Sequence, residues 1–292
     1  MQDEATLGTQ ANSTRLIVQY WHDEDIPGEV AELIASFPAL NPEMHHLVFS
    51  ETSAEEFIAE HFTPREVAAF RACAVPAMQA DYLRYCAVLA FGGIYVDVDM
   101  ECVAPLSSLL EIAGDGVLFG MPRLPPMFRT PAYEWRERLG PYRAINNNIF
   151  AFSSPGHPLL ELALAMATRS IETRSAENVA LTTGPGIFTS LYLLREAGSL
   201  EVYADFVRGG VFEAGVPAFC AMIESRADIE RRLQRVRIPS LSDAARWARP
   251  PKSKPSYKDA EGHWINVKTS IFRAAPQGRR ADLREIEPRH SR

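Results

Sequence analysis

Apolar and polar positions from Pro76 to Asp99 follow helical spacing first and strand spacing afterwards. From Pro76 to Phe91 the apolar residues recur at helical intervals, and the proline can occupy the first turn. Gly92 and Gly93 then provide a C-terminal stop, and the β-prone triplet Ile94-Tyr95-Val96 predicts a short buried strand. This helix–glycine–strand unit is the clearest local structure in the chain.

The same reading extends over most of the sequence. It predicts strands at 15–21, 44–50, 116–120, 145–152 and 200–203, and helices at 27–37, 52–62, 63–73, 158–170 and 187–196. A long loop is expected at 122–141 and an arginine-rich helical surface at 221–250. Because strands alternate with helices, we expect an α/β fold with a mainly parallel central sheet. The domain is expected to span 15–275, between a flexible N-terminus (1–14) and a charged, disordered tail (276–292).

Two carboxylates follow the central strand, at Asp97 and Asp99. Strand alternation would place side chains i and i+2 on one face, so both would point the same way. Two like charges at close range repel unless a positive group lies between them. The pattern therefore indicates a divalent cation.

Asp81 and Arg84 are three residues apart on the predicted helix and share a face. One interpretation is an exposed ion pair that contributes little. The other is a pair beneath the strand end that holds a polyhydroxy ligand. Spacing alone does not choose between them.

Several further positions leave two interpretations open. Tyr20 and Trp21, at the end of the first strand, are core aromatics or stack on a base. The asparagines at 146–148 serve a turn or bind a ligand. Gly184-Pro185-Gly186 is a helix-entry turn or an anion site.

Composition excludes some classes of function. With 292 residues, a formal charge of −7 and a pI near 5.6, the chain is too acidic for nonspecific binding to nucleic acid or anionic membranes. No stretch is long enough to span a bilayer, and no apolar signal region opens the sequence, so we expect a cytoplasmic protein. Without a CxxC pair, the cysteines are expected to be reduced core residues: Cys73, Cys86, Cys102 and Cys220.

Six motifs in order make the sequence resemble a known family. They are Val18-Gln-Tyr-Trp-His22, Ala80-Asp-Tyr-Leu-Arg-Tyr85, Gly92-Gly-Ile-Tyr-Val-Asp-Val-Asp99, Asn147-Asn148 before Ser-Pro-Gly-His-Pro158, Thr183-Gly-Pro185 and His263-Trp264. Across residues 15–266 the chain resembles the glycosyltransferases of family 32, the "DXD sugar-binding" group. It is more distantly similar to the large clostridial toxin glucosyltransferases. The Ser-Trp pair that usually follows the family's late histidine is missing here.

The resemblance implies a GT-A (Rossmann-like) catalytic domain, a UDP- or GDP-linked sugar donor, a small-molecule or glycan acceptor, and Mn²⁺ or Mg²⁺. Members are typically retaining. By position, Asp99 resembles the direct metal ligand, Asp97 would touch the ribose or the metal through water, and His263 would be a third ligand. Asp81 and Arg84 would hold the sugar hydroxyls. The expected donor-binding set is completed by Gln19, Tyr20, Trp21, Tyr95, Asn147, Lys252, Lys254 and Lys258.

Three alternatives to transfer stay open at this point. The same scaffold could run a flavin-independent, metal-dependent nucleotide-sugar mutase (pyranose to furanose) or a hydrolase, since fold does not fix function. A phosphohydrolase would need its Asp-x-Asp on the first strand, followed closely by a small hydroxyl residue, whereas Met100 and Glu101 follow here. A noncatalytic sugar-binding protein would keep donor binding after Asp99→Ala.

Overall fold

The computed structural model describes residues 15–121, 142–174, 178–196, 226–253, 255–259 and 270–273. Several predictions fall outside these residues: the terminal segments, the loop at 122–141, the strand at 200–203, Lys254 and His263. The domain boundaries therefore stay a prediction.

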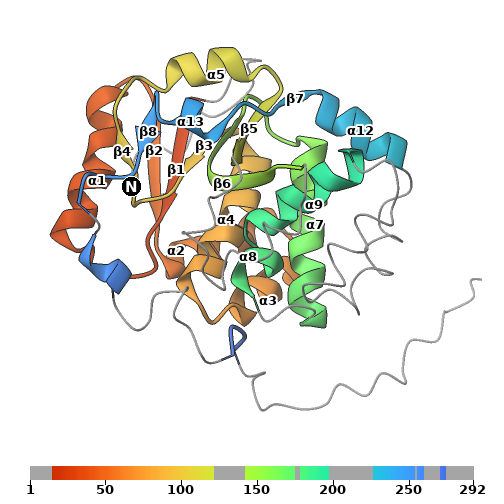
Figure 1. Ribbon diagram of the computed structural model, residues 1–292. Helices are drawn as coiled ribbons and strands as arrows, with labels where there is room; N and C mark the ends of the chain where they lie inside the picture. Colours follow the sequence, from red (N-terminus) through yellow and green to blue (C-terminus); the bar gives the residue numbers. More distant parts are fainter. Residues whose placement is uncertain are drawn as a thin grey trace, which may run out of the picture.

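A six-stranded sheet forms the centre of the fold, in the order β2-β1-β3-β6-β5-β7 (Figure 1). Every strand runs in one direction except β6, which is antiparallel to both of its neighbours. This confirms the predicted α/β fold with a mostly parallel sheet. The strands are β1 (Leu16–Tyr20), β2 (His45–Phe49), β3 (Gly93–Val96), β5 (Gly116–Met121), β6 (Ala144–Phe152) and β7 (Val236–Arg237), and β4 (Glu101–Cys102) pairs separately with β8 (Ala248–Arg249).

Helices cover both faces of the sheet. The described helices are α1 (Gly28–Leu40), α2 (Glu51–His61), α3 (Pro64–Ala72), α4 (Pro76–Phe91), α5 (Ser107–Ala113), α7 (Pro158–Thr173), α8 (Val179–Thr182), α9 (Pro185–Glu196), α12 (Arg226–Gln234), α13 (Leu241–Ala244) and the 3₁₀ helix η3 (Ser256–Asp259). Val18 of β1 faces a core shared with α4, α7 and α9, whereas its neighbour Ile17 faces a second core shared with α1 and α5. Alternation along β1 thus separates the two apolar layers.

Two glycines allow α4 to lead directly into β3. Gly92 ends the helix with φ 71°, and Gly93 follows with φ 95°. A Cβ at Gly93 would lie 2.6 Å from the backbone oxygen of Leu16, so only glycine lets β3 approach β1 this closely. The predicted helix bounds and glycine stop are confirmed.

The site-bearing edge of the sheet is set by the strand order. The chain leaves β1 for β2 on one side, then returns to place β3 on the other side of β1. In open α/β sheets, ligands bind at such a switch point, beyond the carboxyl ends of the strands. Asp97 follows β3 at this edge, and Trp21 follows β1.

The C-terminal part differs from expectation. Instead of a helical surface over 221–250, helix α12 ends at Gln234, and short strands and a single helical turn follow. Val236, Trp247 and Ala248 are buried there. The many arginines around them hid these apolar positions in the sequence. Among the helices in the described ranges, none has the length and apolarity to cross a bilayer.

Candidate active site

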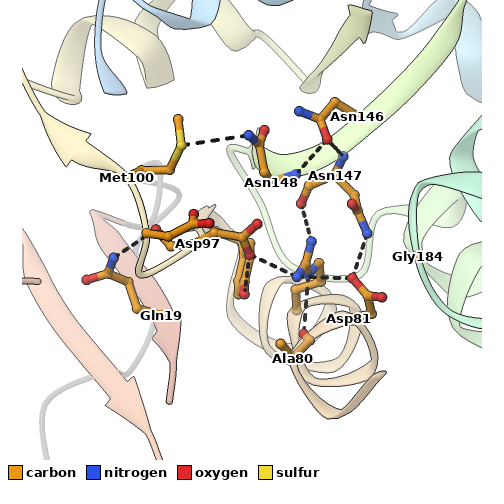
Figure 2. Close-up of polar contacts among 12 residues, drawn as sticks. Gln19, Ala80, Asp81, Asp97, Met100, Asn146, Asn147, Asn148 and Gly184 are labelled. Atoms are coloured by element: carbon orange, nitrogen blue, oxygen red, sulfur yellow. Dashed lines mark hydrogen bonds and ion pairs between the residues drawn. The ribbon is translucent and has the colours of Figure 1, made fainter. Parts of the chain in front are cut away.

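Arg84 joins two carboxylates that come from different elements, Asp81 and Asp97, both of which are labelled in Figure 2. Its Nη2 lies 3.0 Å from Asp81 Oδ1, one turn earlier on α4, and 2.9 Å from Asp97 Oδ1, just past β3. Arg84 and Asp81 are 3% and 5% exposed. The interpretation as an exposed surface ion pair is therefore wrong, because the pair belongs to a buried network whose charges depend on one another.

The remaining nitrogens of Arg84 are also engaged. Nη1 donates to the backbone oxygen of Asn147 at 2.5 Å, and Nε donates to that of Ala80 at 3.2 Å. The guanidinium carbon lies 4.3 Å from the ring centroid of Tyr95, a cation–π distance. Burial alone would lower the pKa of Arg84. The negative charge of Asp97, with Tyr95 and Asp81, raises the pKa by more than burial lowers it, so the group stays cationic.

Asp97 and Asp99 lie in a turn rather than on a strand. Strand β3 ends at Val96, and the backbone N–H of Met100 donates to the oxygen of Asp97 at 3.2 Å. The expectation that strand alternation aligns both carboxylates is wrong for this reason. The Tyr95 hydroxyl donates to Asp97 Oδ1 at 2.9 Å, and the Asp97 N–H donates to the oxygen of Asn148 at 2.8 Å.

The charge state of Asp97 reflects its surroundings. Burial raises the pKa of its carboxyl to about 7, Arg84 opposes this, and Asp99 and Asp81 reinforce it. A carboxyl whose pKa is raised by a neighbouring carboxylate is a favourable place for a divalent cation, since the cation removes the repulsion.

Lys258 brings a positive charge to the other carboxylate. Its Nζ contacts Asp99 Oδ2, and both side chains are partly exposed. Two neighbouring contacts hold the same 3₁₀ helix in place. Ser256 donates to Glu29 Oε1 from its N–H (2.8 Å) and its hydroxyl (2.6 Å), and the Tyr257 ring lies edge-on to Trp21 at 5.2 Å between centroids.

Asp81 has partners on both carboxylate oxygens. Oδ1 accepts from Asn147 Nδ2 at 2.9 Å in addition to Arg84, and Oδ2 accepts from the Thr183 hydroxyl at 3.2 Å. Burial raises the pKa of Asp81, against the lowering effects of Arg84, Asn147 and Thr183. Of the asparagine cluster, Asn147 thus joins the buried network directly.

Gln19 and Tyr20, at the end of β1, have different surroundings. The buried side chain of Gln19 donates to the backbone oxygen of Asp97 at 3.4 Å, while its Oε1 lies 2.8 Å from His46 Nε2. Tyr20 faces the core instead, where its hydroxyl donates to Gln79 Oε1 at 2.9 Å. This position favours the core alternative for Tyr20 over base stacking.

The other predicted donor contacts are more peripheral. Trp21 packs on Val30, Ile34 and Val98 and lies beside Tyr257 at the edge that carries the carboxylates. Lys252 is exposed. The structure thus brings together Asp81, Arg84, Tyr95, Asp97 and Asn147, and Gln19 joins them through the backbone oxygen of Asp97.

Two residues outside the expected donor-binding set lie beside Asp81. Thr183 reaches Asp81, and Gly184 closely approaches it. Thr183-Gly-Pro185 was visible as a motif, but its contact with Asp81 joins residues 102 positions apart. The structure also differs here from the predicted helix at 187–196. Helix α9 already begins at Pro185, and residues 179–182 form a further short helix, α8.

The donor atoms at the turn suit a hard cation. Mg²⁺ and Mn²⁺ prefer oxygen ligands, and Mg²⁺ typically takes one or two carboxylates together with substrate phosphates and water. Asp97 and Asp99 supply two such carboxylates, with side chains 27% and 22% exposed. Within the described residues, no group of three or more His, Cys, Asp or Glu could hold a metal. The donor set fits a cation that is completed by substrate and water.

Comparison with known proteins places these residues in a family context. A family model described as "Glycosyltransferase sugar-binding region containing DXD motif" matches residues 27–113, which include Asp81 through Asp99. Inositol phosphoceramide mannosyltransferase 3 of Schizosaccharomyces pombe is 28% identical over 146 residues, covering 50% of this chain and 35% of that protein. Mannosyl phosphorylinositol ceramide synthase SUR1 of Saccharomyces cerevisiae is 31% identical over 96 residues, covering 33% and 25%.

A further relative aligns over more of the chain. The putative glycosyltransferase HOC1 of S. cerevisiae is 22% identical over 218 residues, covering 68% of this chain and 51% of that protein. The chain spans between a quarter and about half of the length of these relatives. Among solved structures, PaToxG glycosyltransferase is similar, with a TM-score of 0.42, 15% identity and coverage of 76% of this chain and 85% of that one. The family match and the relatives confirm the predicted relationship.

Proposed function

Because the chain carries the sugar-binding region of the DXD glycosyltransferases, we propose that it transfers a sugar from a UDP- or GDP-linked donor to an acceptor hydroxyl with the help of Mn²⁺ or Mg²⁺. The observation that supports this most is the bridge from Arg84 to both Asp81 and Asp97. It couples the residues assigned to the sugar with those assigned to the metal.

In this proposal, Asp97 and Asp99 hold the cation, with His263 as a third ligand. When bound, the cation would act as a Lewis acid toward the diphosphate leaving group, an effect worth several kcal/mol. Arg84 favours the ionised form of Asp97 that a metal ligand requires. Tyr95 fixes the same carboxylate from its own side through its 2.9 Å hydrogen bond.

The sugar of the donor would lie against Asp81, with Arg84 and Asn147 behind it. A carboxylate is a suitable partner because it accepts hydrogen bonds from sugar hydroxyls without donating any itself. Trp21 would lie near the base. Lys252, Lys254 and Lys258 would approach the diphosphate, whose negative charge increases as the anomeric C–O bond breaks.

Transfer with retention is the stereochemical outcome typical of the family that the sequence resembles. In bond terms, the anomeric C–O bond to the diphosphate breaks and its electron pair leaves with the diphosphate. A bond from the acceptor oxygen then forms at the anomeric carbon, and the acceptor proton is released. We propose the same outcome for this chain.

Product analysis tests this function. UDP-glucose and GDP-mannose are incubated with Mn²⁺ and an acceptor panel that includes inositol phosphoceramide, since two relatives are named for mannosyl transfer in that lipid series. The proposal predicts a new glycoside that forms only with acceptor present. An isomerised donor without acceptor would indicate a mutase, and free sugar alone a hydrolase. Either result would overturn the proposal.

A further inference from the structure

Three acceptor positions on the carboxylate of Asp81 have partners among the residues that the structure describes. An ionised carboxylate offers about four lone-pair sites over its two oxygens. Arg84 and Asn147 use Oδ1 at 3.0 and 2.9 Å, and the Thr183 hydroxyl uses Oδ2 at 3.2 Å. The remaining acceptor position is therefore on Oδ2, the oxygen that Thr183 orients.

The backbone that carries Thr183 is fixed from the same helix as Asp81. The hydroxyl of Tyr85, next to Arg84 on α4, donates to the backbone oxygens of Thr183 (2.7 Å) and Gly184 (3.2 Å). Thr183 itself is fully buried, and its N–H donates to the oxygen of Val179 at 3.1 Å. Thr183 therefore reaches Oδ2 from a rigid base rather than from a free loop.

Gly184 lies close to the same carboxylate oxygen, Asp81 Oδ2, and both residues are labelled in Figure 2. A Cβ at this position would lie 3.1 Å from Asp81 Oδ2 and 2.8 Å from the Cα of Ala180. Both distances are shorter than ordinary van der Waals contact, so a side chain here would push on the carboxylate or on α8. Because Gly184 has no side chain, neither Asp81 Oδ2 nor helix α8 is displaced.

We propose that Thr183 and Gly184 are positioning residues that orient Asp81 Oδ2 so that its last acceptor position takes a hydroxyl of the donor sugar. This inference rests on the proposed function and deepens it, since it names the oxygen that meets the sugar. Thr183 acts through Asp81 and does not itself touch the donor. The effect must therefore concern the sugar part of the donor and leave the nucleotide diphosphate part unaffected.

The test compares two ligands of one nucleotide. Calorimetry with Mn²⁺ gives the affinities of wild type and variants for UDP-glucose against UDP, and for GDP-mannose against GDP. In Thr183→Val, which keeps the shape and removes the hydroxyl, we expect about tenfold weaker binding of the sugar nucleotide that wild type prefers, the size typical of a lost hydrogen bond to a charged group. Binding of the matching nucleoside diphosphate should be unchanged.

Two further variants separate positioning from general damage. Thr183→Ser restores the hydroxyl and should restore affinity for the sugar nucleotide. Thr182→Val is a matched control, because this buried neighbour donates its hydroxyl to the backbone oxygen of Asn178 at 2.9 Å. It should bind both ligands as wild type does. Thermal unfolding of each variant accounts for any loss of folded protein.

The outcomes are distinguishable. If Thr183→Val binds the sugar nucleotide as wild type does, or loses affinity for both ligands equally, the positioning role is overturned while the proposed function stands. If wild type binds the sugar nucleotides no better than the diphosphates and releases no diphosphate from them, the proposed function fails, and the inference fails with it. Gly184→Ala should shift affinity in the same direction as Thr183→Val, and an unchanged sugar affinity in a folded Gly184→Ala protein would contradict the role given to Gly184.

Discussion

The ammonium group of Lys258 contacts the carboxylate of Asp99, the residue assigned to direct metal binding. A cation of the chain itself thus lies at the position that a divalent metal would need. The contact is reinforced nearby, where Ser256 binds Glu29 and Tyr257 meets Trp21. Metal binding at Asp99 must compete with this ion pair.

Lys258→Met should therefore tighten the binding of Mn²⁺ alone. Because both side chains are partly exposed, the ion pair contributes at most about 1 kcal/mol, which corresponds to a two- to fivefold change in the Mn²⁺ dissociation constant. Titration followed by electron paramagnetic resonance measures it. Lys252→Met, at an exposed lysine of the same region, should leave the constant unchanged. Equal affinity in wild type and Lys258→Met would show that Lys258 does not compete with the metal.

Arg84→Met should destabilise the protein strongly. The change leaves two carboxylates, Asp81 and Asp97, without their shared counter-charge in a buried setting, which typically costs about 3 to 5 kcal/mol. Urea unfolding gives the free energy of unfolding. The control is Arg71→Met, which removes an exposed ion pair with Glu55 and should change stability by less than about 0.5 kcal/mol. Similar losses in the two variants would refute a buried charge network.

Gly93→Ala tests the close approach of β3 to β1. The left-handed φ of 95° and the 2.6 Å distance from a Cβ to the Leu16 oxygen predict a loss well above about 1 kcal/mol in the free energy of unfolding. Gly28→Ala is the comparison, since nothing lies within 4 Å of a Cβ there, at the start of α1. We expect it to be neutral within about 0.5 kcal/mol. A neutral Gly93→Ala would show that the strands have room to separate.

His157 should make stability depend on pH. Burial, with Arg235 and Arg232 nearby, lowers the pKa of its ring from 6.5 to about 4. Its Nδ1 also accepts from the N–H of Leu159 at 3.1 Å and caps α7, which requires the neutral ring. Since the folded pKa is below the unfolded one, this contribution is complete above pH 6.5 and is lost as the pH falls toward 4.

The size of this loss is about 1 to 2 kcal/mol once solvent screening is allowed for. Urea unfolding from pH 7 to pH 4.5 measures it by comparison with His157→Asn, which retains a capping acceptor and removes the titrating ring. The difference in unfolding free energy between the two proteins should narrow or reverse in favour of the variant at low pH. A constant difference over the range would rule out His157 as the titrating group.

Local sequence patterns were sufficient to predict the helices and turns that carry the site, but not the hydrogen bonds and ion pairs that join its residues. The helix Pro76–Phe91 and its glycine stop follow from apolar spacing and from residues that tolerate positive φ, and the structure has the same bounds. The residues Thr63 and Glu66 have the spacing of a capping box, and the structure forms it, with the Glu66 carboxylate accepting from the Thr63 N–H at 3.1 Å. Such features depend on neighbours within one turn of chain.

The network around Arg84 could not be obtained in that way. Arg84 reaches Asn147 over 63 positions, and Thr183 reaches Asp81 over 102. No local pattern specifies which distant polar group meets a buried charge, since this depends on how the layers pack. The helix α4 is also buried nearly all round, so polar residues on it do not mark a solvent face. For the same reason Asp81 and Arg84 were compatible with an exposed ion pair until their burial was known.

Metal-dependent release of nucleoside diphosphate tests the central claim most directly. Wild type and Asp99→Asn, an uncharged isostere, are compared on the preferred UDP- or GDP-sugar with acceptor, in Mn²⁺ and in EDTA. The proposal predicts release by wild type in Mn²⁺, none in EDTA, and a loss of at least about a hundredfold in Asp99→Asn, equivalent to about 2.7 kcal/mol of transition-state stabilisation. Release that is unaffected by EDTA and by Asp99→Asn would contradict it.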